Sequence, residues 1–101
     1  MKTVQLRRYR LDDATFDAWI EWFREVMAPA RLAFGFSIES AYAVRSSHEF
    51  VWAVSVPGDA AGFLQKDEDW KASSARAAAM AAIPHKVISA QIDLVAPVDG
   101  V

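Results

Sequence analysis

The sequence predicts an α+β fold in which four antiparallel strands form one sheet and helices cover one of its faces. Hydrophobic residues recur every second residue in four segments and every three or four residues between them, in the order β-α-β-β-α-β. Only a short polar joint separates the two middle strand segments, which is typical of a hairpin. The 101 residues suit one domain, and we expect residues 1–101 to form a single unit.

The first predicted strand covers residues 3–11. Its side chains alternate because successive residues of a strand point to opposite faces. One face carries Val4, Leu6, Arg8 and Arg10, and the other carries Gln5, Arg7 and Tyr9. The second face therefore presents an amide, a guanidinium and a phenol in one row.

An amphipathic helix is predicted after this strand. Asp12 or Asp13 can cap it, since a carboxylate there accepts hydrogen bonds from free first-turn amides. Apolar residues then recur at steps of three and four, as a helix buried on one side requires: Phe16, Trp19, Ile20, Phe23, Val26 and Met27. Pro29 lacks an amide hydrogen, so we expect a kink or a break there. Gly35 is expected to end the segment.

Residues 36–45 and 49–57 are expected to form the hairpin. In the first strand the alternation places four apolar residues on one face: Phe36, Ile38, Tyr42 and Val44. The second strand is apolar on both faces over residues 50–56, which is typical of a central strand.

Two helices and a strand are predicted for the rest of the chain. Asp59 is expected to cap a short helix that ends near Lys66. Trp70 is expected to open a second, alanine-rich helix that ends before Pro84. Alternating apolar residues then predict a last strand over residues 86–96.

This order of elements is that of a ferredoxin-like sheet with both helical segments on one face. The helices then cover one face only, yet residues 50–56 are apolar on both. Large exposed apolar patches on soluble proteins usually mark an interface. We therefore expect an obligate homodimer that packs sheet against sheet.

Six pieces of the chain are together similar to one known family: Val4–Leu11, Phe16–Phe23, Phe50–Ala53, Trp70, Met80 and Leu94–Pro97. They resemble the NIPSNAP family, in the superfamily of dimeric α+β barrels. The resemblance implies a ferredoxin-like fold and a dimer. Relatives in this superfamily include cofactor-free monooxygenases, ring-modifying lyases and isomerases, and members without known activity, so the resemblance alone does not select a reaction.

The polar candidates for catalysis are Arg7, Tyr9 and His85. Arg7 can hold a carboxylate or an enolate, and Tyr9 beside it can donate a proton. His85 stands at the start of the last strand, and histidine is the residue type most often used for acid–base chemistry. A structural role is the alternative, in which Arg7 pairs with an acid such as Glu39 or Asp93.

A hydrophobic ligand would require an aromatic pocket. The candidates for lining one are Trp22, Tyr42, Trp52 and Trp70. Trp22 is off the main helical stripe, which places it at a pocket rim or in the dimer interface. Packing in the core is the alternative for the others, since buried aromatic residues serve this purpose most often.

Composition excludes several classes of function. The chain has no cysteine, which removes disulfides and thiolate zinc sites. A net charge of −2 and the lack of glycine-rich phosphate motifs argue against nucleic-acid and nucleotide binding. We expect no cofactor, no metal and no membrane span. Because the first residues lack the apolar segment of a signal peptide, we expect a cytoplasmic protein.

Two hypotheses of function are compatible with these features. In the first, the protein is a cofactor-free enzyme of the monooxygenase, isomerase, cyclase or lyase type, acting on a hydrophobic or aromatic small molecule. In the second, it is a non-catalytic ligand-binding or assembly module. An enclosed apolar cavity with convergent polar groups favours the first, and a solidly packed layer favours the second.

Overall fold

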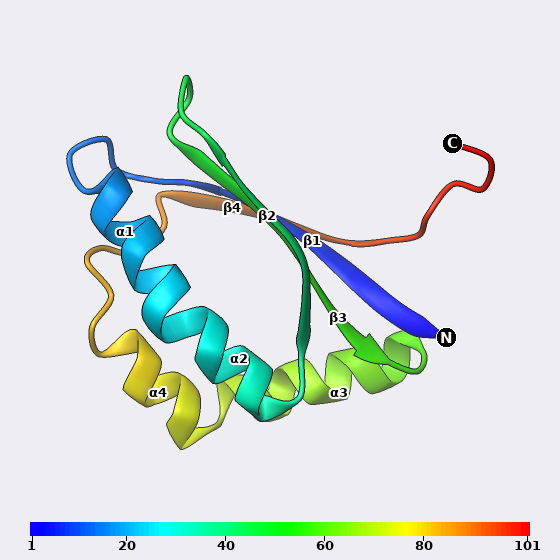
Figure 1. Cartoon of the computed structure of the whole chain (residues 1–101). Coiled ribbons are helices and arrows are strands. Elements are labelled where there is room, and N and C mark those ends of the chain that lie inside the picture. The colour runs from blue at the N-terminus through cyan, green and yellow to red at the C-terminus, as the bar shows by residue number, and fades with distance from the viewer.

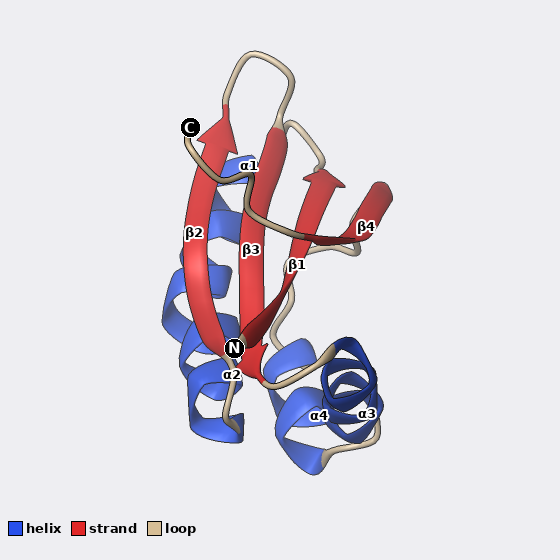
Figure 2. Ribbon diagram, turned by 90° about the vertical axis from the view of Figure 1, so that its right-hand side faces the viewer, coloured by secondary structure: helices blue, strands red, loops and turns tan.

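Four strands form one antiparallel sheet in the computed structural model, which describes residues 1–101. They are β1 (Lys2–Arg10), β2 (Ser37–Val44), β3 (Glu49–Pro57) and β4 (Ser89–Val95), in the order β2-β3-β1-β4 across the sheet. The helices lie on one side of this sheet and leave its other face open, as Figure 1 and Figure 2 show. The predicted α+β fold with a four-stranded antiparallel sheet is therefore confirmed.

The first helical segment continues through Pro29, so of the expected kink or break the break does not occur. It consists of α1 (Phe16–Trp22), the π-helical turn η1 (Phe23–Met27) and α2 (Ala28–Phe34). The amide of Ala28 donates to the carbonyl oxygen of Phe23, five residues back. Pro29 then follows this π-helical turn as the second residue of α2. Gly35, with φ of +106°, ends the segment as predicted.

The second helical segment divides at a different place than the sequence predicts. It consists of α3 (Ala60–Lys71) and α4 (Ser74–Met80). Asp59 caps α3 as predicted, because its carboxylate accepts a hydrogen bond of 2.9 Å from the amide of Gly62. The helix continues past Lys66 and Asp67, so Trp70 lies in its last turn and does not open α4. No helix of the protein is both long and apolar enough to cross a membrane.

A β-bulge in β2 reverses part of the predicted face pattern. The pairing of β2 with β3 shifts between Ile38 and Ser40. A bulge of this kind turns the side chains that follow it to the opposite face. Ile38 packs against the core, whereas Tyr42 lies opposite Val51 on the open face and is 67% exposed. The expectation that Ile38 and Tyr42 share a face is therefore wrong.

The core lies between the sheet and the helices, and it is mainly aromatic. Its aromatic members are Tyr9 of β1, Phe16, Trp19, Trp22 and Phe23 of the first helical segment, Phe36 before β2, Phe50 and Trp52 of β3, and Phe63 and Trp70 of α3. Rings of this size contribute much of the hydrophobic burial of a small domain. The apolar stripe predicted for the first helix is thus the surface that packs on the sheet.

The open face of the sheet mixes apolar and charged residues. Its central strands present Val4, Leu6, Arg8 and Arg10 from β1 and Val51, Ala53 and Ser55 from β3. Residues 96–101 leave β4 on this side of the sheet, away from the helices (Figure 1, Figure 2).

Candidate functional site

A cavity of about 540 Å³ lies between the sheet and the helices. Its walls come from β1, β3, β4, both helical segments and the loop before β4. Twelve of its sixteen lining residues are hydrophobic, which suits a largely apolar molecule. The other four lining residues are all basic: Arg7, Arg31, Arg76 and Lys86.

The entrance of the cavity lies at β4. The residues of its inner wall, among them Trp19, Trp52 and Trp70, are buried. Ile92 of β4 and Lys86 of the preceding loop are exposed, although both line the cavity. A molecule entering past this edge strand would therefore meet the aromatic wall behind it.

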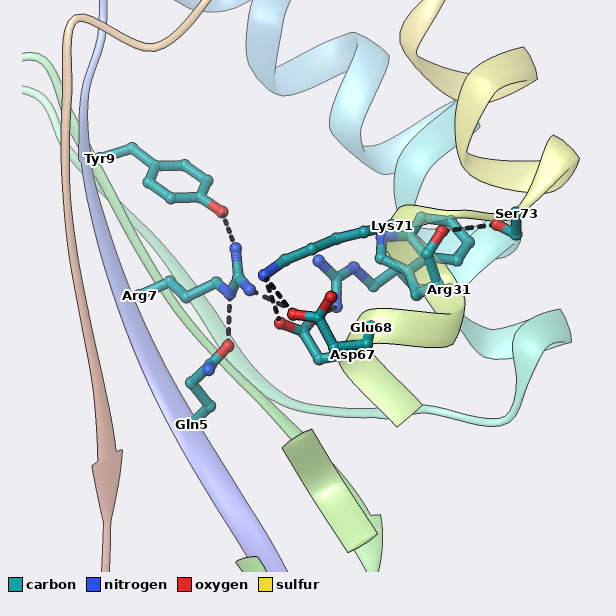
Figure 3. Close-up of polar contacts among 9 residues, drawn as sticks. Gln5, Arg7, Tyr9, Arg31, Asp67, Glu68, Lys71 and Ser73 are labelled. Carbon is teal, nitrogen blue, oxygen red and sulfur yellow. Dashed lines mark hydrogen bonds and ion pairs between the residues drawn. The ribbon is translucent and has the colours of Figure 1, made fainter. Parts of the chain in front are cut away.

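Arg7 is the centre of a buried polar row on the covered face of β1 (Figure 3). Its Nε donates a hydrogen bond of 2.6 Å to Oε1 of Gln5, and its Nη1 donates one of 2.9 Å to the hydroxyl of Tyr9. All three side chains are buried, because the helices cover this face. The strand alternation thus brings together the amide, guanidinium and phenol that the sequence predicts.

The acid that pairs with Arg7 is Asp67 of α3, not Glu39 or Asp93, which lie on the open face. Oδ1 of Asp67 is 3.5 Å from Nη2 of Arg7 and 4.0 Å from Nη1 of Arg31. Neither contact is a good hydrogen bond at these distances, and Oδ1 has no hydrogen-bond partner within the chain. The interaction of Asp67 with the two arginines is therefore mainly electrostatic attraction without a close hydrogen bond.

Arg31 projects from α2 and is only 4% exposed. Its guanidinium carbon lies 4.9 Å from the ring centroid of Phe36, 5.2 Å from that of Trp52 and 5.1 Å from that of Trp70. Ring faces stabilise a cation held in this way. Burial, and then the positive charge of Arg7, lower the pKa of Arg31 to about 10, so the group stays charged at neutral pH.

Several solved structures are similar to this chain over nearly its whole length. Neither a protein-family model nor a curated protein matches the sequence. A NIPSNAP family protein from Agrobacterium tumefaciens str. C58 matches with a TM-score of 0.83 and 10% identity, over 99% of this chain and 96% of that chain. A NIPSNAP domain protein from Burkholderia xenovorans matches with a TM-score of 0.82 and 13% identity, over 100% and 98%. The chain has the NIPSNAP fold.

A protein from Mycobacterium tuberculosis matches with a TM-score of 0.66 and 14% identity, over 98% of this chain and 97% of that chain. At such identities the likeness concerns the fold alone. Another NIPSNAP family protein from Agrobacterium tumefaciens, with a TM-score of 0.81, is described as having unknown function. The NIPSNAP fold therefore selects no reaction, and the argument for function depends on the residues of the cavity.

Three of the four predicted aromatic residues meet at the cavity of this NIPSNAP fold. The cavity is lined by Trp22 of α1, Trp52 of β3 and Trp70 of α3. The indole N–H of Trp22 donates a hydrogen bond of 2.9 Å to the carbonyl oxygen of Ala79, which fixes α1 to α4. Tyr42 lies on the opposite face of the sheet, because of the bulge in β2.

His85 is not among the residues that line the cavity. Its Nε2 accepts a hydrogen bond of 3.0 Å from the amide of Asp12, and its Nδ1 contacts the hydroxyl of Thr15. These contacts tie the loop before β4 to the start of α1, and they engage both ring nitrogens. No cluster of three or more histidine, aspartate or glutamate side chains is placed to hold a metal ion.

Sequence reasoning missed Arg31 and Asp67, although helical spacing points to both. Arg31 follows Phe23 and Met27 at steps of four, so it continues the buried stripe of the first helix. Asp67 lies between Phe63 and Trp70 at steps of four and three, on the buried side of α3. Extending each apolar stripe across the charged residue would have predicted two buried ions.

Proposed function

We propose that the protein is a homodimer that binds a hydrophobic or aromatic small molecule in its cavity and converts it as a cofactor-free enzyme of the monooxygenase, isomerase, cyclase or lyase type. The observation that supports this most is the pair of Arg7 and Tyr9 in the wall of a largely hydrophobic cavity. Polar groups that converge in an apolar pocket are the usual mark of a binding or active site.

The two residues would have complementary roles. Arg7 would stabilise negative charge that develops on an oxygen of the bound molecule, since buried donors act strongly where water is excluded. The Tyr9 hydroxyl accepts a hydrogen bond from Arg7, which leaves its own O–H free to donate toward the cavity. Tyr9 is therefore the residue we assign to proton transfer.

Native mass spectrometry of freshly purified protein tests this proposal first. We expect a retained small molecule on the wild type, lost on denaturation. Incubating that compound with the wild type should convert it, and Tyr9→Phe should lower the rate by about a hundredfold or more with binding retained. A compound that the wild type retains but does not convert would contradict the enzyme and leave only a binding protein.

A binding module without catalysis is the second candidate, and one observation favours it. Apart from Tyr9, the ionisable side chains that line the cavity are three arginines and a lysine, with no carboxylate or histidine among them, so the cavity offers few groups for acid–base chemistry. Under this alternative the retained molecule comes off unchanged, and Tyr9→Phe alters affinity alone.

The homodimer in this proposal uses the open face of the sheet. Apolar residues lie at its centre, where Leu6 is opposite Ala53, and residues 96–101 extend from the same side. Packing two such faces together would bury this apolar area, which is the usual reason for an exposed patch. Light scattering at low micromolar concentration should give the mass of a dimer, and a monomer would contradict this part of the proposal.

A further inference from the structure

We propose that the molecule held in the cavity is an organic carboxylate with a flat hydrophobic body, and that Arg7 and Arg31 bind its carboxylate group. This inference rests on the proposed function, because it names the chemical class of ligand for the same cavity. It depends on three observations: the sign of the charges, the lack of hydrogen-bond acceptors, and the shape of the apolar wall.

The charges that line the cavity are all positive. Arg7 and Arg31 lie in its buried part, and Arg76 and Lys86 lie closer to the solvent. Asp67 is the buried acid that faces the two arginines, so one of their two positive charges is left without a counter-charge. An unpaired buried charge is costly, and a monoanion bound beside it would offset that cost.

The buried groups also lack hydrogen-bond acceptors. Six buried side-chain atoms have no hydrogen-bond partner within the chain, and five of them are N–H donors: Nε and Nη1 of Arg31 and the indole nitrogens of Trp19, Trp52 and Trp70. All four of these residues line the cavity. The sixth atom is the acceptor Oδ1 of Asp67. Since buried donors are normally satisfied, a ligand that brings acceptor oxygens fits the five donors.

The geometry around Arg31 favours a carboxylate at this point. Figure 3 shows the guanidinium groups of Arg7 and Arg31 approaching Asp67 from different sides. A guanidinium presents a planar fork that matches the two oxygens of a carboxylate. Rings of Trp52 and Trp70 lie against Arg31 and also line the cavity, so a flat apolar body attached to the carboxylate would lie against aromatic rings.

Three naphthalene probes that differ in one group test the inference by isothermal titration calorimetry. They are 2-naphthoate, its neutral analogue 2-naphthamide, and the cationic 2-naphthylmethylamine. On the wild-type protein at pH 8 we expect 2-naphthoate to bind at least about tenfold more tightly than 2-naphthamide, because hydrogen bonds between charged partners are the stronger kind. We expect the amine to bind most weakly.

Arg31→Met then removes the charge and keeps much of the side-chain volume. The affinity for 2-naphthoate should fall about tenfold or more, whereas the affinity for 2-naphthamide should change less than threefold. Arg24→Met is the matched control, because Arg24 is exposed on η1 and pairs with Glu21 outside the cavity. This control should leave the affinities for both probes unchanged.

The possible results distinguish a failure of the carboxylate preference from a failure of the proposed binding function. If 2-naphthamide binds the wild type as tightly as 2-naphthoate, the cavity binds apolar molecules and the preference for a carboxylate is wrong. If none of the three probes binds, both the inference and the proposed binding function are wrong. The comparison of probes on the wild type needs no variant, so it decides the question even if Arg31→Met does not fold.

Discussion

Arg7 and Arg8 are neighbours on β1, yet they lie on opposite faces of the sheet and differ in burial and in their partners. Arg8, on the open face, makes two hydrogen bonds of 2.9 and 3.0 Å to the carboxylate of Glu49, although its side chain is 47% exposed. Arg7, on the covered face, is 8% exposed and bonds only the neutral groups of Gln5 and Tyr9.

The difference between the two arginines indicates that Arg7 is the one available to a ligand. A buried arginine that served the fold alone would be expected to have the closer acid, because desolvation must be offset by an opposite charge. Here the exposed arginine has the bidentate partner, while Asp67 stays 3.5 Å from the buried one. On the covered face we therefore expect a negatively charged ligand to balance the buried positive charge.

The largest expected effect is on the stability of the covered face. Asp67→Asn removes the acid between Arg7 and Arg31 and leaves two buried cations uncompensated, so we expect a loss of about 3–5 kcal/mol in the free energy of unfolding. Glu49→Gln, the equivalent change on the open face, should cost much less, because the pair of Glu49 with Arg8 is exposed to solvent. Urea unfolding at one protomer concentration measures both, and equal losses would contradict the comparison.

The next effect concerns the open face as an interface. Leu6→Asp places a carboxylate at the centre of this face, opposite Asp93, and should raise the dimer dissociation constant by about a hundredfold or more, since burying an unpaired charge is costly. Leu32→Asp is the control, because Leu32 is an exposed residue of α2. Sedimentation equilibrium measures both variants. A dimer that tolerates Leu6→Asp as well as Leu32→Asp does not use this face.

The smallest effect is the titration of Glu49. Hydrogen bonds from Arg8, and then from Ser47, lower the pKa of Glu49 to about 2 from an ordinary 4.5. Because the folded value is below the unfolded one, this ion pair stabilises the fold above about pH 4.5, and its contribution disappears as the pH falls toward 2. Arg8→Met should move the pKa of Glu49 toward 4.5 in a carboxyl NMR titration. An unchanged value would mean that Arg8 is not its cause.

The sequence predicted the elements whose residues depend on a simple period. The alternation of β1 places Gln5, Arg7 and Tyr9 on one face by geometry alone, and β3 is central because its residues are apolar on both sides. The helical stripe of Trp19 and Phe23 is likewise set by spacing. These features need no knowledge of distant parts of the chain.

The features that sequence reasoning missed depend on contacts between distant segments. The bulge in β2 is a shift of register against β3, and alternation within one strand does not reveal it. Helical spacing places Arg31 and Asp67 on buried faces, but charged residues are ordinarily solvated, and only the packing of α2 and α3 around the cavity shows that both are buried. The cavity itself is lined by residues of the sheet, both helical segments and the loop before β4, which are far apart in the sequence.

In this proposal the buried arginines of the covered face, unlike those of the open face, bind a carboxylate. Titration of 2-naphthoate into Arg7→Met and Arg8→Met by calorimetry compares the two faces, because the two substitutions are chemically identical and adjacent in sequence. Arg7→Met should lower the affinity per protomer by about tenfold or more, and Arg8→Met should leave it unchanged. Equal affinities of the two variants for 2-naphthoate would contradict the proposal.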